Sequence, residues 1–408
     1  MSEWKETELR KHINYKKGFA FKSSMYQESG RLVVRVSDTT MNSVNVNGCV
    51  KIDEILAFQF KDYELQEGDI VIMTVGSWPD NPASVVGKVI RIPKQAEGAL
   101  LNQNSVRIRT NNTIDKHFLY YKLKSNDFSG YIENTAQGSA NQASITLEDI
   151  FSYKFLLPSP NEQKAISNVL KIIDDKIDLL NRQNLTLEKM AETLFRQWFV
   201  EEANEGWEEI KLGSIVDIIN GVSYKSEDLN SSKTAMVTLK SFDRNGGFRM
   251  DGFKEYTGKF KEQHILKEGD LVVAHTDITQ EADVIGNPVM VIANPKYDTI
   301  IFSMDLVKVI SKDENYSNEF LYLLMKSKEF KEHCLGYSNG STVLHLSKKA
   351  IPEYEMKLPP NKLINEFSIN VKPLVQKQFR NQTQIRTLTS LRNTLLPKLM
   401  SREVIVEP

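Results

Sequence analysis

Residues that could support covalent or metal chemistry are few in this chain and poorly grouped. His333 and Cys334 form a base and a nucleophile on paper. Adjacent residues of a helix point to different faces, so we expect a structural role for this pair. Asp277, Glu281 and Asp283 lie close together in a polar loop, and we interpret them as solvated loop acids. We therefore predict no catalytic residue and no metal site.

Motifs for nucleotide binding and hydrolysis are missing as well. The sequence has no Gly-x-x-x-x-Gly-Lys-Ser/Thr loop, no Rossmann glycine fingerprint and no Gly-x-Ser-x-Gly elbow. Its two cysteines, Cys49 and Cys334, cannot form a disulfide framework or a four-cysteine zinc site. We expect no cofactor in this chain.

The composition is that of an ordinary soluble protein. Of the 408 residues, 40% are hydrophobic and 26% charged, and the formal net charge is −1. This balance excludes a histone-like basic coat and an acidic disordered tail. The first residues are charged and no apolar run reaches about 18 residues, so we expect no secretory signal, no membrane span and a cytoplasmic location.

The elements that must position any functional residues occur twice. Glu3–Leu9 resembles Gly206–Leu212, and Gly18–Ser23 resembles Gly221–Ser226, both at an offset of 203 residues. Glu67–Val71 resembles Glu268–Val272 at an offset of 201. A period near 200 residues is too long for a solenoid unit and indicates two copies of a whole domain plus a connector.

Each copy reads as a compact α+β domain. We predict strands over Arg31–Val36, Asp69–Thr74 and Ser84–Ile90, and over Ala235–Leu239, Asp270–Ala274 and Val289–Ile292. Short helices are predicted at Lys116–Lys124 and Asn318–Lys331. Gly68 and Gly269 indicate turns with positive φ, whose flanking acids we expect to stay solvated.

A long helix is predicted after each copy. Asn161–Phe199 has no Gly or Pro, and its heptad seam is Ile166, Ile173, Leu180, Leu187 and Leu194, with Asn184 in the second row. This is typical of a coiled coil in which a polar Asn fixes the register. The alternative is a long amphipathic helix in a globular core.

The second segment, Asn361–Met400, has a corresponding seam that includes Leu388 and Leu395. We expect Pro373 to break or kink this helix, giving a short helix before it and a longer one after it. The two segments are natural partners, because residues 161–206 carry a net charge of −3 and residues 361–408 one of +5. We predict an antiparallel coiled coil and a pseudo-two-fold symmetric α+β protein, with domains at 1–160 and 207–360 and helical segments at 161–206 and 361–408.

Three strings in the helical segments resemble a known family. They are Leu157–Ile166, Ile177–Asn184 and, most specifically, Leu391–Ser401. They resemble the conserved regions of DNA specificity subunits of type I restriction-modification systems, in the family's order of recognition domain and helix, twice. Arg402 departs from the glycine expected after Ser401.

The resemblance implies a non-catalytic subunit with two target recognition domains, each reading one half of a bipartite double-stranded DNA sequence. Its helices set the spacer and dock two methyltransferase subunits, which use S-adenosylmethionine. Two motor-nuclease subunits, which use ATP and magnesium, complete the restriction enzyme. The seam residues named above, from Ile166 to Leu194 with Leu388 and Leu395, are then our candidate partner-binding positions.

Candidate DNA ligands follow from the same resemblance and from the preference of phosphates for basic groups. In the first domain they are Lys16, Lys17, Lys22, Arg31, Arg35, Arg107 and Arg109, the last two on one strand face. In the second they are Lys225, Lys240, Arg244, Arg249, Lys348 and Lys349. For each, an ordinary solvated surface role stays open.

Two glycine loops are candidates for reading bases. The first offers Gln137, Ser139, Asn141 and Gln142, and the second offers Asn339, Ser341 and Thr342. Amides pair with adenine edges, and glycine lets the backbone approach a phosphate. An ordinary turn before a strand is the alternative.

Two other functions stay open: a coiled-coil scaffold that binds no DNA, and a stand-alone nuclease. The recognition domains are not basic overall, with net charges of +1 for residues 1–160 and −4 for residues 207–360. We therefore expect this subunit to bind DNA weakly without the positive charge of its methyltransferase partners.

Overall fold

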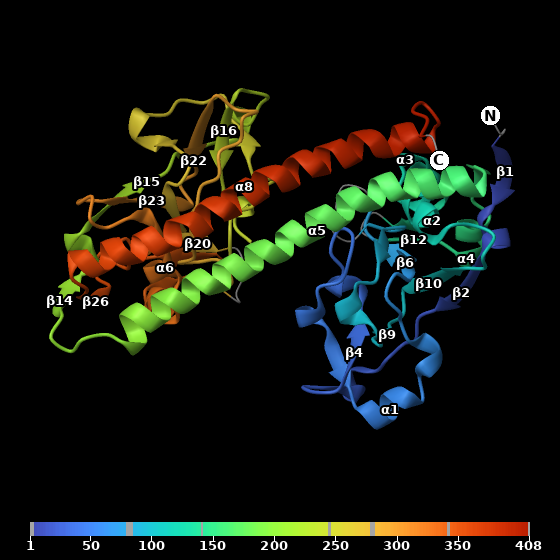
Figure 1. Cartoon of the computed structure of the whole chain (residues 1–408), viewed down its shortest axis with the longest axis horizontal. Helices are drawn as coiled ribbons and strands as arrows, with labels where there is room; N and C mark the ends of the chain where they lie inside the picture. The colour runs from blue at the N-terminus through green and yellow to red at the C-terminus, as the bar shows by residue number, and fades with distance from the viewer. Residues whose placement is uncertain are drawn as a thin grey trace. The chain divides into compact units, whose positions relative to one another are not determined.

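The computed structural model describes residues 4–78, 85–139, 142–243, 246–277, 282–340 and 343–406. These form two compact units, and Figure 1 labels many of their helices and strands. The first reaches Ile177 and includes the chain from Leu388 onward, and the second is Asp178–Thr387. Both long helices therefore contribute residues to both units, and the domain boundaries at 160, 206 and 360 stay predictions.

The first unit combines small sheets with short helices. Its sheets have the strand orders β1-β13, β2-β10-β6-β8, β11-β12-β7 and β3-β5-β4-β9. The strands are β1 (Lys5–Glu8), β2 (Ile13–Lys17), β3 (Tyr26–Gln27), β4 (Arg31–Val34), β5 (Val50–Ile52), β6 (Ile70–Met73), β7 (Val75–Gly76), β8 (Val89–Arg91), β9 (Leu100–Leu101), β10 (Ser105–Thr110), β11 (Gln137–Ser139), β12 (Gln142–Ser144) and β13 (Lys154–Leu157). The short helices are α1 (Glu54–Phe58), α2 (Lys116–Leu123), α3 (Asn126–Thr135) and α4 (Leu147–Phe151).

The second unit has sheets with the orders β14-β26, β15-β23-β19-β21, β17-β16-β22-β18 and β20-β25-β24. The strands are β14 (Glu208–Lys211), β15 (Val216–Asn220), β16 (Thr234–Val237), β17 (Lys254–Glu255), β18 (Ile265–Leu266), β19 (Leu271–Ala274), β20 (Thr276–Asp277), β21 (Pro288–Met290), β22 (Thr299–Phe302), β23 (Leu306–Ser311), β24 (Ser338–Asn339), β25 (Leu344–Leu346) and β26 (Glu355–Leu358). The short helices are α6 (Asn318–Lys326) and α7 (Lys328–Gly336).

The predicted duplication is confirmed by the topology. The sheet β2-β10-β6-β8 has the same connectivity as β15-β23-β19-β21, and β4 pairs with β9 in parallel as β16 pairs with β22. Gly68 and Gly269 have φ values of +84° and +86°, as their turns require. The predicted strand over Ser84–Ile90 is placed too early, because a turn precedes β8.

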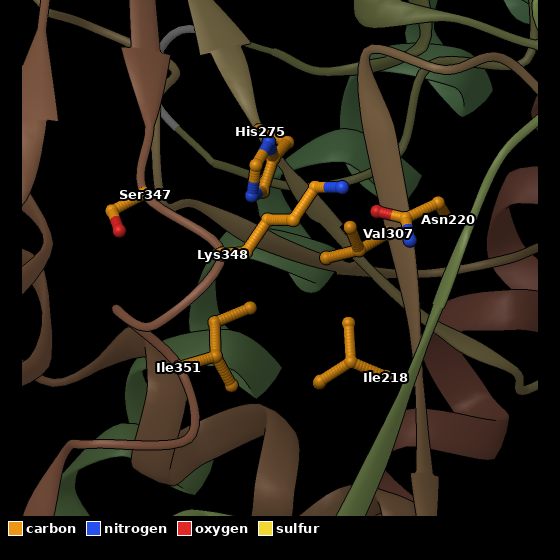
Figure 2. Close-up of a pocket in the computed structure, with 7 residues that line it drawn as sticks. All are labelled: Ile218, Asn220, His275, Val307, Ser347, Lys348 and Ile351. Carbon is orange, nitrogen blue, oxygen red and sulfur yellow. The ribbon is translucent and has the colours of Figure 1, made fainter.

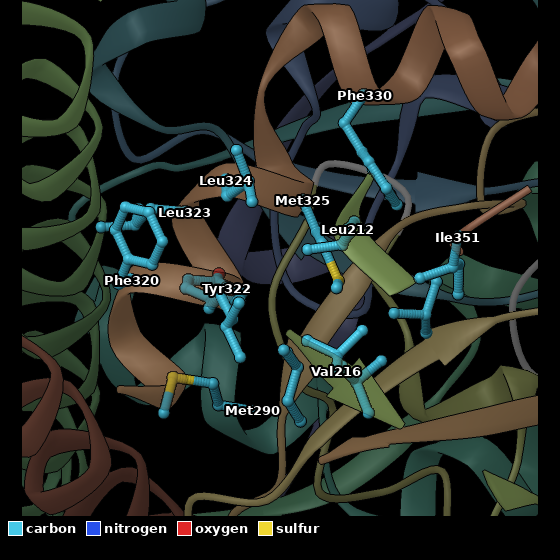
Figure 3. Packing of buried hydrophobic residues seen from close by; sticks show 14 of the residues in the cluster. Leu212, Val216, Met290, Phe320, Tyr322, Leu323, Leu324, Met325, Phe330 and Ile351 are labelled. Atoms are coloured by element: carbon cyan, nitrogen blue, oxygen red, sulfur yellow. The ribbon is translucent and has the colours of Figure 1, made fainter. Parts of the chain in front are cut away.

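The second unit shows how a core positions these sheets. Figure 3 shows α6 side chains such as Phe320 and Met325 beside Leu212, Val216 and Met290, all in one buried cluster. The single helix predicted over Asn318–Lys331 is instead two. Ser327 has extended backbone angles and its hydroxyl accepts the Phe330 amide, so it ends α6 and caps α7.

The first long helix, α5 (Pro160–Arg196), forms as predicted. The Ser159 hydroxyl and the Glu162 carboxylate satisfy each other's backbone amides in a capping box, and Pro160 begins the first turn. Past Arg196 the helix widens into a π-turn at Gln197–Glu201.

The second long helix, α8 (Asn361–Met400), runs without interruption through Pro373. The predicted break at Pro373 is therefore wrong. The proline is exposed, whereas Val371 and Val375 on either side of it are buried in the core of the second unit. We infer that burial of this face offsets the backbone hydrogen bond that Pro373 cannot make.

Within each unit α5 and α8 pair in opposite directions, which confirms the predicted antiparallel pairing (Figure 1). In the first unit Arg392 Nη1 donates to Asp174 Oδ1 at 2.8 Å. In the second, Asn381 Nδ2 donates to Asn184 Oδ1 at 2.8 Å, and Gln378 Nε2 donates to Glu188 Oε2 at 2.6 Å. The Asn184–Asn381 bond supplies the polar contact that we expected to fix the register.

Candidate nucleic-acid interface

The glycines of the two candidate loops lie at an edge strand of a three-stranded sheet: Gly138 is in β11, and Gly340 directly follows β24. A Cβ on Gly138 would lie 2.0 Å from the carbonyl oxygen of Gln142, and one on Gly340 would lie 2.0 Å from that of Val343. A side chain at either position would clash with this backbone oxygen, so glycine is required at both. Gln137, Gln142 and Asn339 are exposed. Asn141, Ser341 and Thr342 lie outside the described residues, as does the side chain of Ser139, which ends β11.

Arg107 and Arg109 share one face of β10, as their alternation predicts, and both donate to Glu64 O. Arg109 also makes two hydrogen bonds to the Asp69 carboxylate, at 2.7 and 2.8 Å. Asp69 in turn accepts the Gln66 amide at 2.8 Å. The expectation that Asp69 stays solvated is wrong: it is 6% exposed because it closes the turn and pairs with Arg109.

The second domain repeats this arrangement with a lysine. Lys308 Nζ donates to Asp270 Oδ2 at 2.7 Å, and the Lys267 amide donates to the same oxygen at 2.8 Å. Asp270 is thus not fully solvated either. Lys308 occupies the strand position of Arg107 rather than that of Arg109, and its contact with Asp270 gives it a structural function as well.

The other candidate arginines also contact acids of their own domain. Arg31 binds Glu54, Arg35 makes two hydrogen bonds to Asp38, and Arg249 makes two to Asp251. Lys16 lies 3.1 Å from Asp62. The exposed candidate lysines are Lys17, Lys22, Lys225, Lys240, Lys348 and Lys349. Arg244 is outside the described residues. Roles in DNA contact remain predictions for all of them.

A pocket of about 200 Å³ opens in the second domain (Figure 2). Its walls are Ile218, Val307 and Ile351, and its polar groups come from Asn220, His275, Ser347 and Lys348. Burial first, then the nearby Lys348 and His345, lower the pKa of His275, so its imidazole is neutral at pH 7. Sequence reasoning found only Lys348. The signal it missed is positional, since Asn220 ends β15 where Lys17 ends β2.

The described residues considered for covalent or metal chemistry are buried or make contacts within the fold. Burial raises the pKa of the Cys334 thiol to about 12, and His333 Nε2 lies 2.8 Å from Ala350 O. The expectation that Asp277 is a solvated acid is wrong, because Asp277 is 2% exposed and accepts hydrogen bonds from the amides of Val284 and Ile285. Glu281 lies outside the described residues. No group of three or more metal-ligating side chains occurs among the residues that the structure describes.

Comparison with known proteins settles the family. The model described as "Type I restriction modification DNA specificity domain" matches residues 1–189 and 204–385. The chain belongs to this family. It is a specificity subunit with two target recognition domains, and it is a non-catalytic component of its restriction-modification system.

The relatives of this specificity subunit have low sequence identity to it, but the matches cover most of each chain. It is 27% identical over 330 residues to the Type I restriction enzyme MjaIX specificity subunit of Methanocaldococcus jannaschii, covering 75% of this chain and 73% of that protein. It is 21% identical to the HindI specificity subunit of Haemophilus influenzae, covering 83% of this chain and 87% of that one. The fold matches the crystal structure of the type I S subunit from M. genitalium, with a TM-score of 0.55, 19% identity and coverage of 97% and 96%.

Polar clusters fasten the long helices to each recognition domain. In the first unit Tyr121 of α2 donates to Asp174 Oδ2 at 2.8 Å, beside Arg392. In the second unit Glu188 of α5 accepts hydrogen bonds from Tyr322, Lys326 and Gln378. Burial alone would raise the pKa of Glu188, but these donors outweigh it and hold the pKa below its ordinary value.

The candidate partner-binding residues divide by burial. Ile166, Ile173 and Leu180 are buried within the chain, so their side chains are not on a surface that another subunit reaches. Leu187, Leu194, Leu388 and Leu395 are partly exposed. The large apolar side chains that α5 exposes are Ile172, Leu179, Leu185 and Met190. No helix of the described residues is long and apolar enough to cross a membrane.

Proposed function

We propose that each recognition domain of this specificity subunit reads one half of a bipartite sequence in double-stranded DNA. The observation that carries this is the duplication: two units with the same sheet connectivity, each with a glycine hairpin at one sheet edge. The scaffold alternative is not favoured by membership of the family.

The long helices have two functions in this proposal. They set the length of the unread gap, and they dock two methyltransferase subunits that methylate adenine with S-adenosylmethionine. Two motor-nuclease subunits that use ATP and magnesium complete the restriction enzyme. The exposed apolar side chains of α5 support the docking function, because such groups are typical of protein interfaces. We place the assembly in the cytoplasm, where it defends a prokaryotic cell against phage.

An exchange of one domain tests the proposal. Residues 1–160 are replaced by the first recognition domain of another specificity subunit, and methylated sites are mapped in cells that also express the methyltransferase. We expect one half of the target to change while the other half and the gap stay the same. A change in both halves, or in neither, would contradict the assignment of one domain to one half.

A further inference from the structure

We propose that the pocket between Asn220, His275 and Lys348 holds the major-groove edge of one purine of the DNA target. This assignment rests on the proposed function, because it names residues that read the half-site of the second domain. It concerns side chains that come together only in the fold, since Asn220 ends β15, His275 follows β19 and Lys348 follows β25.

Three polar groups of the pocket, those of Asn220, His275 and Lys348, are available to a ligand. Among the described residues, no hydrogen bond or ion pair joins the side chains of Asn220, His275 and Lys348 to another group of the protein. Figure 2 shows the Lys348 amine and the Asn220 amide extending toward each other beside the His275 ring. None of the described residues that line the pocket is acidic. Three unpaired polar groups above apolar walls make a site that can fix the orientation of a planar polar group.

The chemistry of these groups fits a base edge better than a phosphate. An Asn amide and a neutral imidazole each offer both a donor and an acceptor, whereas a phosphate needs donors and positive charge. Adenine presents an N7 acceptor and an N6 donor in the major groove, and guanine presents N7 and O6 acceptors. Asn220 and His275 match the first pattern and Lys348 the second, and both patterns share N7. The volume of about 200 Å³ is below the ~300–1,000 Å³ usual for small-molecule sites, so it suits one inserted edge.

The pocket lies next to a candidate DNA-reading loop. Lys348 lies two residues after β25, and His345 in that strand pairs with both Asn339 and Thr276. The Leu346 amide donates to His275 O at 2.9 Å. Asn339 belongs to the small sheet β20-β25-β24, and the pocket residues His275 and Lys348 flank two strands of that sheet. A DNA edge at Asn339 is therefore close to the pocket.

The two domains differ at this place. Lys17 opposes Val106 in the first domain as Asn220 opposes Val307 in the second, so Lys17 takes the position of Asn220. Thr74 follows β6 as His275 follows β19. Tyr15 of β2 lies against Phe151, with ring centroids 4.4 Å apart. Two domains with the same strand connectivity need different side chains at equivalent positions if they read two different half-sites. The differences at these positions therefore support a function in sequence specificity.

The test uses the full chain in complex with its methyltransferase. Variants Asn220→Ala, His275→Ala and His275→Gln are mapped for methylated sites, with Lys328→Ala, at an exposed side chain of α7, as the matched control. We expect the two alanine variants to lose discrimination at one purine of the second half-site only. His275→Gln keeps a neutral donor and acceptor and is expected to retain most of it. Lys328→Ala should leave the whole pattern unchanged.

A binding experiment identifies the contacted atom. Duplexes carrying 7-deazapurine at each purine of the second half-site are titrated by fluorescence anisotropy. We expect the wild-type complex to bind about tenfold more weakly when one particular purine is replaced, as for the loss of one good base contact. The same replacement should not weaken binding by the alanine variants any further. Asn220 is exposed at a strand end, so its truncation leaves the fold intact and the assay readable.

Two results would overturn the inference. One is an unchanged second half-site in both alanine variants. The other is a uniform loss of affinity for all sequences with no 7-deazapurine effect, which would make the pocket a phosphate contact. Failure of the proposed function looks different, because the wild-type chain would then show no bipartite target, or a pocket variant would alter both halves.

Discussion

At the residue scale, the structure separates basic groups that hold the domains together from those open to a ligand. Arg109 satisfies the buried carboxylate of Asp69, which in turn closes the turn before β6. The sequence predicts that Arg107 and Arg109 share a face, because strand periodicity is local. The partner of Arg109 is 40 residues away and becomes visible only when β10 pairs with β6. Asn220 and His275 come together for the same reason, without any motif.

Asp69→Asn is expected to lower the free energy of unfolding by about 2 kcal/mol, because it removes the charge from hydrogen bonds that Arg109 and the Gln66 amide donate. Urea unfolding of the isolated chain measures the change. The matched control is Asp62→Asn, whose carboxylate is exposed and paired with Lys16, and it should have almost no effect. Equal losses in the two variants would contradict the structural function of Asp69.

The Glu188 cluster makes a prediction about pH. Since the folded state holds the pKa of Glu188 below its ordinary 4.5, the carboxylate stabilises the fold above that pH and loses this contribution as the pH falls through the lowered value. Glu188→Gln should therefore cost about 2 kcal/mol near pH 7 and less in acid. Unfolding curves between neutral and acidic pH measure the difference. Glu192→Gln, at a more exposed carboxylate, is the control, and a cost for Glu188→Gln that does not depend on pH would refute the account.

At the element scale, heptad periodicity predicts the two long helices, but local propensity does not show how α8 tolerates a proline. The heptads of α5 predict its length to within a few residues, and Asn184 predicts a polar contact in the seam. Pro373 misleads, because local propensity predicts a break while the buried faces of Val371 and Val375 are fixed by tertiary packing. Ser327 separates α6 from α7 by capping the second helix, and this cap is not visible in the sequence periodicity.

Pro373→Ala tests this explanation. Restoring the missing backbone donor inside a continuous helix should raise the free energy of unfolding, by up to about 3 kcal/mol. Pro360→Ala, at the exposed start of the segment where no amide partner is needed, should give no gain. A loss of stability in Pro373→Ala would mean that the ring makes contacts essential to the fold.

At the scale of the whole molecule, the near-constant offset of about 200 residues predicts the duplicated architecture. The two units share their strand connectivity, and in each of them α5 and α8 pair in opposite directions. Duplication is readable from sequence because it preserves order and spacing. The bases that each domain reads cannot be predicted from the sequence, because the side chains that we propose to contact them, such as Asn220 and His275, come together only in the fold.

The helices make a prediction about spacing. One heptad is inserted in α5 after Leu180 and one in α8 before Ile385, so that the antiparallel pairing is kept. Seven residues add about 10 Å of helix, or about three base pairs of DNA. We expect the unread gap to lengthen by about that amount with both half-sites unchanged, as mapped by methylated-site sequencing. Full activity with the original gap would show that the helices do not set the spacing.

The most direct test of the central claim is the methylome of cells that carry this subunit with its methyltransferase. The account predicts one asymmetric motif, with two short defined halves separated by a gap of fixed length and an adenine methylated in each half. A single continuous motif, or methylation that does not depend on this chain, would contradict it.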